Sequence, residues 1–431
     1  MKSNRILSVP ELRSQIPHGV QDRFMVEAAR RRQVEAVLRE HFCRWGYQEV
    51  ITPTFEYYDN LVVGASPELQ LAMYCFFDRD GRTLALRADF TPQIARTAAT
   101  KLFDQPMPLR CFYIGSLFRY EEPQAGRKRE FTQAGIELIG ADTTSADAEV
   151  VALAVTALGA LNLQNFQVNL GQMAFFHALT AGLSPDSVTA IREAIDRKSS
   201  TRLARALTTP EVTPAQRELL ARLHDWVGGA EVLEEARALS TNLPEATAAM
   251  AAIDRLAEVY RLLQVYGMGD RVILDLGEVR GMDYYTGITI RGMVPGLGWP
   301  ILSGGRYDNL IAYFGRSLPA VGFGLGIERV LLVQSRYRMP APSIVPHLLV
   351  QSCDHPACHD LIQRLRARGC RVEVDVLGLD GSHLSDLAHQ RGIPRTLRCV
   401  SGSWLLSDKR GEHLLTESEL WQEVDTWGIG E

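Results

Sequence analysis

The sequence of 431 residues predicts an α+β fold with two domains, over residues 1–335 and 344–431. Strand-like segments with glycine turns lie on both sides of an Ala-, Leu- and Glu-rich helical stretch at about residues 184–266, which predicts a sheet core with a helical insertion. After a Pro-containing linker, SRYRMPAPSIVP, short strands alternate with helix-like stretches. That alternation predicts a small C-terminal α/β domain.

The first element is an amphipathic helix at about residues 24–45. Val34, Leu38 and Phe42 fall on one helical stripe, and Gly46 supplies a stop. The segment GYQEVITPTFE follows, and its β-branched pair ends at Pro53. Because proline cannot donate to a strand ladder, we expect a strand at an edge of the sheet.

The helical insertion carries its own boundary signals. Thr213 and Pro214 resemble an N-cap and a first helical residue, and a leucine-rich stripe runs from Leu219 to Val227. The Gly228–Gly229 pair predicts the end of this helix. In the C-terminal domain, HLLV, RVEVDV and TLRCV are the predicted strands.

Composition and charge exclude several classes of protein. The net charge of −5 gives no basic field for general nucleic-acid binding. Seven irregularly spaced cysteines do not form a disulfide framework, and no run reaches the length of a membrane span. We therefore expect a cytoplasmic protein with no membrane contact.

The segment FRYEEPQAGRKREFTQAGIELIG, residues 118–140, carries the first chemistry. Alternation on its second strand places Gln133, Gly135 and Glu137 on one face, so that glycine leaves floor space for a small polar ligand. Gly115 on the preceding strand leaves room in the same way. The arginines of the loop suit phosphate or carboxylate, although a solvated hairpin tip would explain them as well.

Two further segments strengthen the functional interpretation. EVRGMDYYTGITI leads into a strand that SGGRYDNL follows, and PAVGFGLGIERVLLV turns from a glycine-interrupted strand into a helix. Together with GYQEVITPTFE and residues 118–140, they resemble the motifs of class II aminoacyl-tRNA synthetases, and RGMDYYTG and GGRYDNL are similar to segments of the histidyl-tRNA synthetase branch. The resemblance covers most of residues 17–335 and implies an antiparallel sheet flanked by helices, which dimerises through the first motif.

The resemblance also implies a histidine pocket. Its six residues would be Asp89, Thr91 and Gln133 at the ammonium group, Glu137 and Tyr285 at the imidazole, and Arg280 at the carboxylate. A carboxylate and a phenol can satisfy both ring nitrogens of histidine. In a synthetase, four further residues would hold ATP, namely Arg119, Glu121, Arg127 and Arg329. All four are present, so the sequence leaves a residual ATP site open.

Departures from the synthetase pattern favour a non-catalytic relative. LRADFTPQIAR has a shorter carboxylate at Asp89 and a bulky Phe90 where the synthetase has glycine, and Glu130 stands where glutamine is usual. ADFTPQIAR resembles the regulatory subunits of ATP phosphoribosyltransferase, which bind histidine and assemble with a short catalytic subunit at the first step of histidine biosynthesis. The C-terminal domain only partly resembles an anticodon-binding domain, so tRNA binding is not expected.

The resemblance to these regulatory subunits implies a chain without catalytic residues or a cofactor. It also implies a homodimer within a hetero-oligomer, with L-histidine as its effector. Histidyl-tRNA synthetase and another amino-acid-activating enzyme are the alternatives. CDHPACH, residues 353–359, gathers two cysteines and two histidines. Tetrahedral zinc sites draw ligand pairs from separated turns. We therefore interpret this segment as a helix start, and expect no metal.

Overall fold

The computed structural model describes residues 15–121, 128–279 and 284–427. It divides into two compact units, Met1–Pro340 and Ala341–Glu431, and each unit is described by itself.

The first unit is built on a large mixed sheet, which has nine strands within the described residues. β1 pairs with β5 and β7 with β9 in parallel, while the other neighbours are antiparallel. The predicted α+β fold is therefore confirmed, with two parallel pairs added to an antiparallel core. In sheet order the strands are β1 (Gln48–Glu49), β5 (Leu109–Phe118), β6 (Glu130–Ile139), β12 (Ala320–Gly326), β11 (Leu302–Arg306), β10 (Ile288–Met293), β7 (Gln167–Gln172), β9 (Val272–Asp275) and β8 (Val227–Gly228).

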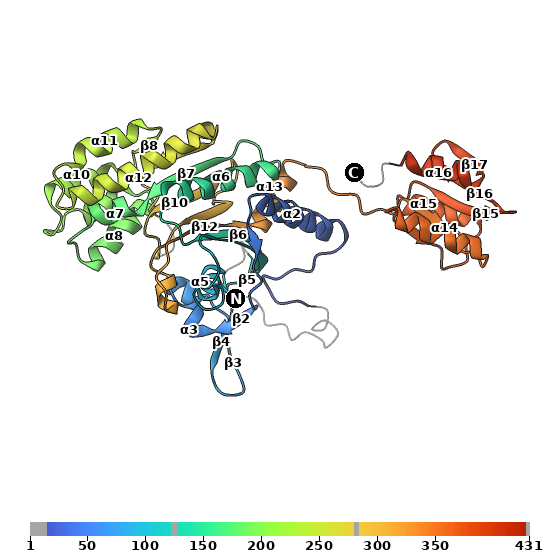
Figure 1. Ribbon diagram of the computed structural model, residues 1–431, viewed down its shortest axis with the longest axis horizontal. Coiled ribbons are helices and arrows are strands. Elements are labelled where there is room, and N and C mark those ends of the chain that lie inside the picture. Colours follow the sequence, from blue (N-terminus) through green and yellow to red (C-terminus); the bar gives the residue numbers. More distant parts are fainter. Residues whose placement is uncertain (1–14, 122–127, 280–283, 428–431) are drawn as a thin grey trace, which may run out of the picture. The chain divides into compact units, whose positions relative to one another are not determined.

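Helices cover the sheet (Figure 1). Ala134, Ile136 and Leu138 of β6 belong to the larger hydrophobic core, which includes buried residues of three helices, α2 (Met25–Arg44), α6 (Thr144–Ala160) and α13 (Ile327–Arg336). α6 is apolar almost all round, and it also packs against α12 (Ala246–Val265). A second core, to which Ile139 belongs, includes α5 (Thr91–Thr100) and the 3-10 helix η2 (Ile311–Phe314). Strand alternation thus gives β6 two differently equipped faces.

Residues between β1 and β5 form a small three-stranded sheet. Its strands are β2 (Phe55–Tyr57), β4 (Thr83–Leu86) and β3 (Cys75–Phe77), and its helices are α3 (Tyr58–Leu61) and α4 (Pro67–Leu71). Phe55 and Phe76 contact each other edge-to-face across this sheet and are 52% and 38% exposed.

The segment between β7 and β9 is mainly helical, and its helices gather at one end of the unit in Figure 1. They are α7 (Met173–Leu179), α8 (Pro185–Asp196), α9 (Ser200–Ala206), α10 (Pro214–Arg222), α11 (Glu231–Ser240) and α12 (Ala246–Val265), followed by the 3-10 helix η1 (Gly269–Arg271). Thr213 caps α10 in a capping box with Gln216, as its sequence indicates. The predicted helix end at Gly228 is wrong, because Val227 and Gly228 form β8, which pairs with β9.

The second unit is a five-stranded sheet within the described residues, with three helices. Its sheet order is β14 (Val372–Val374), β13 (Leu348–Val350), β15 (Thr396–Val400), β16 (Ser403–Asp408) and β17 (Gly411–Leu415), and its helices are α14 (Pro356–Ala367), α15 (Gly381–Gln390) and α16 (Glu417–Asp425). The three strands expected from the sequence are present, and a hairpin of β16 and β17 extends the sheet.

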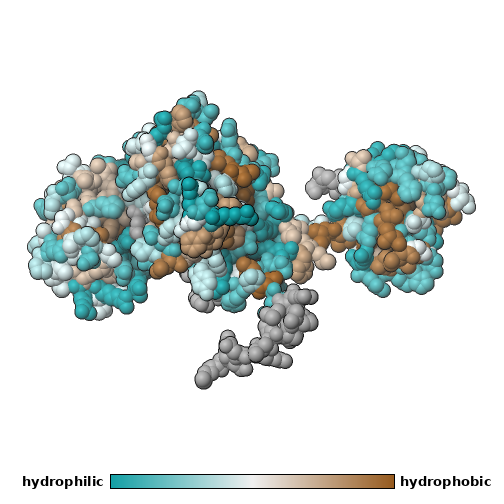
Figure 2. Space-filling model, turned by 90° about the horizontal axis from the view of Figure 1, so that it is seen from below, coloured by the Kyte–Doolittle hydropathy of each residue, from teal (hydrophilic) through white to brown (hydrophobic). Residues whose placement is uncertain are grey.

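The surface is mostly hydrophilic, with hydrophobic residues gathered in patches on the visible face (Figure 2). Among the described residues, no helix combines the length and the apolar character that crossing a membrane requires.

Candidate functional site

A cavity of about 430 Å³ opens over β6, β11 and β12, beside the start of α5. Its size is typical of a small-molecule site. One end is rich in carboxyl and phenol groups, and the other is rich in cationic groups. The lining residues used below are Asp89, Thr91, Tyr113, Gln133, Glu137, Tyr284, Tyr285 and Tyr307 at the first end, and Arg119, Glu121, Lys128, Trp299, Glu328 and Arg329 at the second.

Glycines of β12 allow the two key side chains of β6 to lie across the sheet. Gly322 pairs with Glu137, and Gly326 pairs with Gln133. A Cβ atom at Gly322 would lie 1.9 Å from Glu137 Oε2, and one at Gly324 would lie 2.1 Å from Gln133 Nε2. The glycine-interrupted strand therefore keeps the space that these side chains occupy.

Glu137 is the buried centre of the first end, with 1% exposure. Its Oε1 accepts a hydrogen bond from the Thr91 hydroxyl at 3.1 Å, and its Oε2 accepts one from the Tyr307 hydroxyl at 2.6 Å. Tyr113 is a further hydrogen-bond partner. Since a carboxyl group offers about four lone-pair positions, these three partners still leave one for a ligand.

The protonation of Glu137 follows from its burial. Burial raises the pKa of Glu137 to about 8, the hydrogen bond from Tyr307 opposes that rise, and the negative charge of Asp89 adds to it. The carboxyl is therefore mostly protonated at pH 7 in the empty cavity, and can donate as well as accept a hydrogen bond.

The neighbouring phenols remain neutral donors. Burial raises the pKa of Tyr113, Tyr284, Tyr285 and Tyr307 above the usual range. The Tyr284 ring makes edge contacts with both Tyr285 and Tyr307, with centroids 5.2 and 5.6 Å apart. These packed rings fix the wall of the cavity that faces Glu137.

Gln133 has an unmet hydrogen-bonding capacity. Its Oε1 atom is buried and has no hydrogen-bond partner among the described residues. Asp89 and Thr91 line the same end of the cavity, and the Asp89 carboxylate accepts from the Tyr284 hydroxyl at 3.2 Å. Because buried acceptors are normally satisfied, the Gln133 oxygen indicates a missing donor.

Five of the six residues assigned to histidine thus lie together in the cavity, whereas Arg280 falls outside the described residues. Three of the four residues assigned to ATP, Arg119, Glu121 and Arg329, line its second end, and Arg127 also falls outside the described residues. Arg119 donates to the Ala88 carbonyl at 2.9 Å and lies over the Phe131 ring. One cavity therefore spans both residue sets.

Three expectations about the surroundings are wrong. The space at Gly115 is filled by the Arg87 guanidinium and the Phe90 ring, and the space at Gly135 by the Tyr113 hydroxyl. Phe90 stacks on Tyr113 in the second core, so it does not crowd a ligand loop.

Glu130 also differs from its expected place beside the ATP-site arginines. It lines a neighbouring hollow of about 250 Å³ together with Arg23, Arg31 and Lys128. Strand alternation explains the difference, because Glu130 and Gln133 lie on opposite faces of β6.

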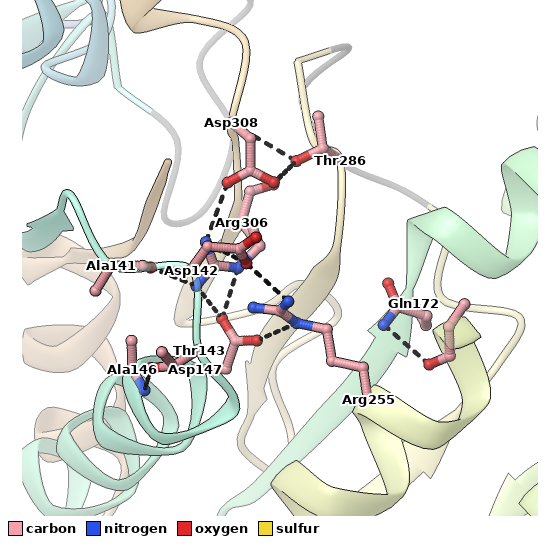
Figure 3. Close-up of polar contacts among 11 residues, drawn as sticks. Ala141, Asp142, Thr143, Ala146, Asp147, Gln172, Arg255, Thr286, Arg306 and Asp308 are labelled. Atoms are coloured by element: carbon pink, nitrogen blue, oxygen red, sulfur yellow. Dashed lines mark hydrogen bonds and ion pairs between the residues drawn. The ribbon is translucent and has the colours of Figure 1, made fainter. Parts of the chain in front are cut away.

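A buried ion-pair network holds the segments that carry Tyr285 and Tyr307 (Figure 3). Arg306, 1% exposed, binds Asp147 of α6 at 2.6 Å and Asp308 at 3.0 Å. Arg255 of α12 binds the other oxygen of Asp147 at 2.7 Å. Asp308 in turn accepts from the Thr286 hydroxyl at 2.7 Å. Tyr307 and Tyr285 directly adjoin these residues, so the network positions both phenols.

Sequence reasoning missed several lining residues. Tyr113 and Tyr307 bind Glu137, and Trp299 Nε1 is a buried donor without a partner among the described residues. Tyr307 lies in the GGRYDNL segment that carried the resemblance, so a signal for it existed. Tyr113 shares the alternation of Gly115, but Trp299 lies in a glycine- and proline-rich stretch without periodicity.

Comparisons with known proteins agree with this fold. The family model described as Histidyl-tRNA synthetase matches residues 19–330. A histidyl-tRNA synthetase from Nostoc sp. PCC 7120 has the same fold, with a TM-score of 0.79, 21% identity and coverage of 96% of this chain and 99% of that chain. A chain from Bacillus halodurans C, described as an ATP phosphoribosyltransferase regulatory subunit/histidyl-tRNA synthetase, is 28% identical, with a TM-score of 0.78 over 90% and 98% of the two chains. Fold and site thus define a histidyl-tRNA synthetase-like class of protein.

Curated relatives identify the family of the chain within this class. A protein of Moorella thermoacetica is 44% identical over 384 residues, which cover 88% of this chain and 96% of the relative. One of Symbiobacterium thermophilum is 39% identical over 398 residues, covering 91% and 98%. Both are named ATP phosphoribosyltransferase regulatory subunit, and the chain belongs to this family of regulatory subunits.

Proposed function

We propose that this chain is the histidine-binding, non-catalytic regulatory subunit of a cytoplasmic ATP phosphoribosyltransferase, the enzyme of the first step of histidine biosynthesis. The observation that carries the proposal is the unpartnered Gln133 Oε1 beside the Glu137 and Tyr285 groups in one cavity. Family membership supports the regulatory role, and the cavity supports the binding of the effector in this chain.

L-histidine suits the first end of the cavity in its charges and donors. Its ammonium group would donate to Gln133 Oε1 and to the Asp89 carboxylate, and its imidazole would bind Glu137 and Tyr285. A histidine side chain with a pKa near 6.5 and a carboxyl with a pKa of about 8 share one proton around neutral pH. Between these two pKa values the proton can lie on either partner, so a donor and an acceptor face each other.

The partner is a short-form catalytic subunit that carries out phosphoribosyl transfer itself. Histidine bound in this chain changes that activity only if the complex has two states that bind histidine differently, and the coupling is then reciprocal. We propose that histidine binds the less active state more tightly, which gives feedback inhibition.

A homodimer is proposed within the hetero-oligomer. The exposed Phe55 and Phe76 rings of the small sheet support a protein interface there, since clustered exposed apolar groups mark interaction sites. Phe55 lies in GYQEVITPTFE, the segment that resembles the first synthetase motif, and this supports a second copy of the chain as the occupant.

Histidyl-tRNA synthetase is the second candidate. Arg119, Glu121 and Arg329 favour it, because they line the cavity beside the amino-acid end where a nucleotide would lie. An aminoacylation assay with histidine, ATP and cognate tRNA separates the candidates. We expect no charging, and robust formation of histidyl-tRNA would replace the regulatory proposal.

The direct test is to follow phosphoribosyl-ATP formation by the catalytic subunit with and without this chain and histidine. We expect this chain to raise activity and histidine to lower it. An activity and a histidine response that do not change when this chain is added would refute the proposal.

The variant Glu137→Ala tests the histidine site itself. We expect calorimetry to show histidine binding weakened by about 1–3 kcal/mol, because an imidazole group loses its buried partner. Glu218→Ala, at an exposed position of α10, is the matched control and should bind as the wild type does. If both variants bind histidine with equal affinity, Glu137 does not belong to the histidine site.

A further inference from the structure

Three cysteines come together in the second unit from separate elements. Cys353 follows β13, Cys358 lies in the first turn of α14, and Cys399 lies on β15. Their Sγ atoms all lie within 4.8 Å of one another, and those of Cys353 and Cys358 are 2.7 Å apart. Sequence spacing favoured an incidental cluster because tetrahedral sites need ligands from separated turns. Cys399 meets that requirement from 41 residues beyond Cys358, on another strand.

We propose that Cys353, Cys358 and Cys399 form a binding site for a thiophilic d10 cation, with Zn²⁺ as the physiological ion. Three sulfur ligands select soft or borderline cations over Mg²⁺ and Ca²⁺, which require oxygen. The fourth position is left to water or to an exchangeable ligand.

The distances are close to those of a zinc–thiolate site. A Zn–S bond of about 2.3 Å in tetrahedral geometry separates neighbouring sulfurs by roughly 3.8 Å. The upper limit of 4.8 Å for the cluster exceeds that separation by about one ångström, and the 2.7 Å pair falls short by a similar amount. Zinc binding would therefore require shifts of about one ångström between the sulfur atoms.

Two features of the surroundings suit sulfur ligands. The backbone N–H of His355 donates to Cys353 Sγ at 3.4 Å, which supplies an outer hydrogen bond of the kind that supports metal ligands. Cys358 is the third residue of α14, a helix of 12 residues, where the N-terminal dipole favours an anion.

Binding of the cation displaces the thiol protons. Cys358 is buried among apolar side chains. Zinc binds cysteine as the thiolate, so three thiols and one Zn²⁺ give a complex of charge −1 and release three protons. Cys353 and Cys399 are only partly buried, which leaves the ion a path of entry.

The site would tie the loop after β13 to β15. Both strands belong to the core of this unit, and β15 also carries the hairpin of β16 and β17. A metal bound to the folded state alone raises the stability of that unit by mass action.

The test uses the purified, reduced full-length chain loaded with zinc and separated from excess metal. We expect one zinc ion per chain by mass spectrometry of the eluted metal, and a thiolate charge-transfer band when Co²⁺ replaces Zn²⁺. Cys353→Ser and Cys399→Ser should weaken binding on the order of 100-fold or more, because loss of even an outer partner costs about 10- to 100-fold. Cys75→Ser, at an exposed cysteine of the first unit, should bind as the wild type does.

Two outcomes would overturn the site. The first is a reduced wild-type chain that retains no zinc, in which case the cysteines act as small apolar core residues. The second is zinc retained equally by Cys353→Ser, Cys399→Ser and the wild type. Circular dichroism of each variant shows whether it is folded, and the thiolate band of the Co²⁺-loaded wild type tests cysteine ligation even if a variant unfolds.

Discussion

Glu137 combines nearly complete burial with several hydrogen bonds, and its charge therefore depends on pH within the physiological range. The folded-state pKa of about 8 lies above the ordinary value of 4.5. The folded chain consequently holds this proton more tightly than the unfolded chain does. The contribution of Glu137 to stability is fully present below about pH 4.5 and is lost as the pH rises to about 8.

A glutamine in place of Glu137 keeps the shape of the side chain but cannot ionise. We expect Glu137→Gln to reduce the fall in the free energy of unfolding between pH 5 and pH 8, because a glutamine does not release a proton when the chain unfolds. Urea unfolding of wild type and variant at both pH values measures the difference. Parallel pH profiles would show that Glu137 does not titrate in this range.

The sequence predicted Gln133 and Glu137 on one face of β6, because strand alternation is a local property. The partners of Glu137 could not be read in the same way. Tyr307 follows β11 and reaches Glu137 across β12, and Tyr113 fills a space that the sequence assigned to ligand. Contacts between distant strands depend on register, which no single segment specifies.

At the scale of elements, alanine substitutions at two glycines of β12 should have different effects, one on histidine binding and one on stability. A methyl group at Gly324 would meet the flexible end of Gln133, whereas one at Gly322 would lie 2.3 Å from the backbone oxygen of Ile136. We expect Gly324→Ala to lose histidine binding with little change in stability. Gly322→Ala should cost about 1–3 kcal/mol of stability, as overpacking does. Calorimetry and thermal unfolding of the pair give both quantities, and identical behaviour of the two variants would contradict the register argument.

The ion-pair network of Asp147 makes a second element-scale prediction. Asp147→Ala leaves Arg306 buried without its main partner and should destabilise the fold by about 3–5 kcal/mol. Asp254→Ala breaks the exposed pair with Arg237 and should cost at most about 1 kcal/mol. Denaturant unfolding measures both. A cost at Asp147 as small as that at Asp254 would show that the network contributes little.

The sequence predicted helices and strands that follow from a local pattern. It did not predict those that depend on pairing with a distant strand. Thr213 as N-cap and Pro214 as first helical residue identified the start of α10, but the strand β8 is recognised only through its partner β9. The cysteine cluster shows the same limit, since Cys399 joins it through the pairing of β15 with β13.

At the scale of the whole molecule, every described residue assigned to the histidine and ATP sets belongs to the first unit. We therefore expect a chain ending at Pro340 to bind histidine with the affinity of the full chain, within about threefold. Calorimetry on the two chains tests this, with circular dichroism as the control for folding. A large loss of affinity in a folded truncated chain would assign the second unit a part in effector binding.

The alternating glycines of β12 restrict how the cavity can change its ligand over evolution. Gly322 and Gly324 provide the space that Glu137 and Gln133 occupy, so a mutation on either strand acts on both. A descendant that recognised another amino acid would need matched replacements on β6 and β12, and most of the single-mutation intermediates would bind no amino acid. Sequence divergence is therefore easier at positions away from β6 and β12. At those positions a regulatory protein can gain or lose partners while its choice of effector stays the same.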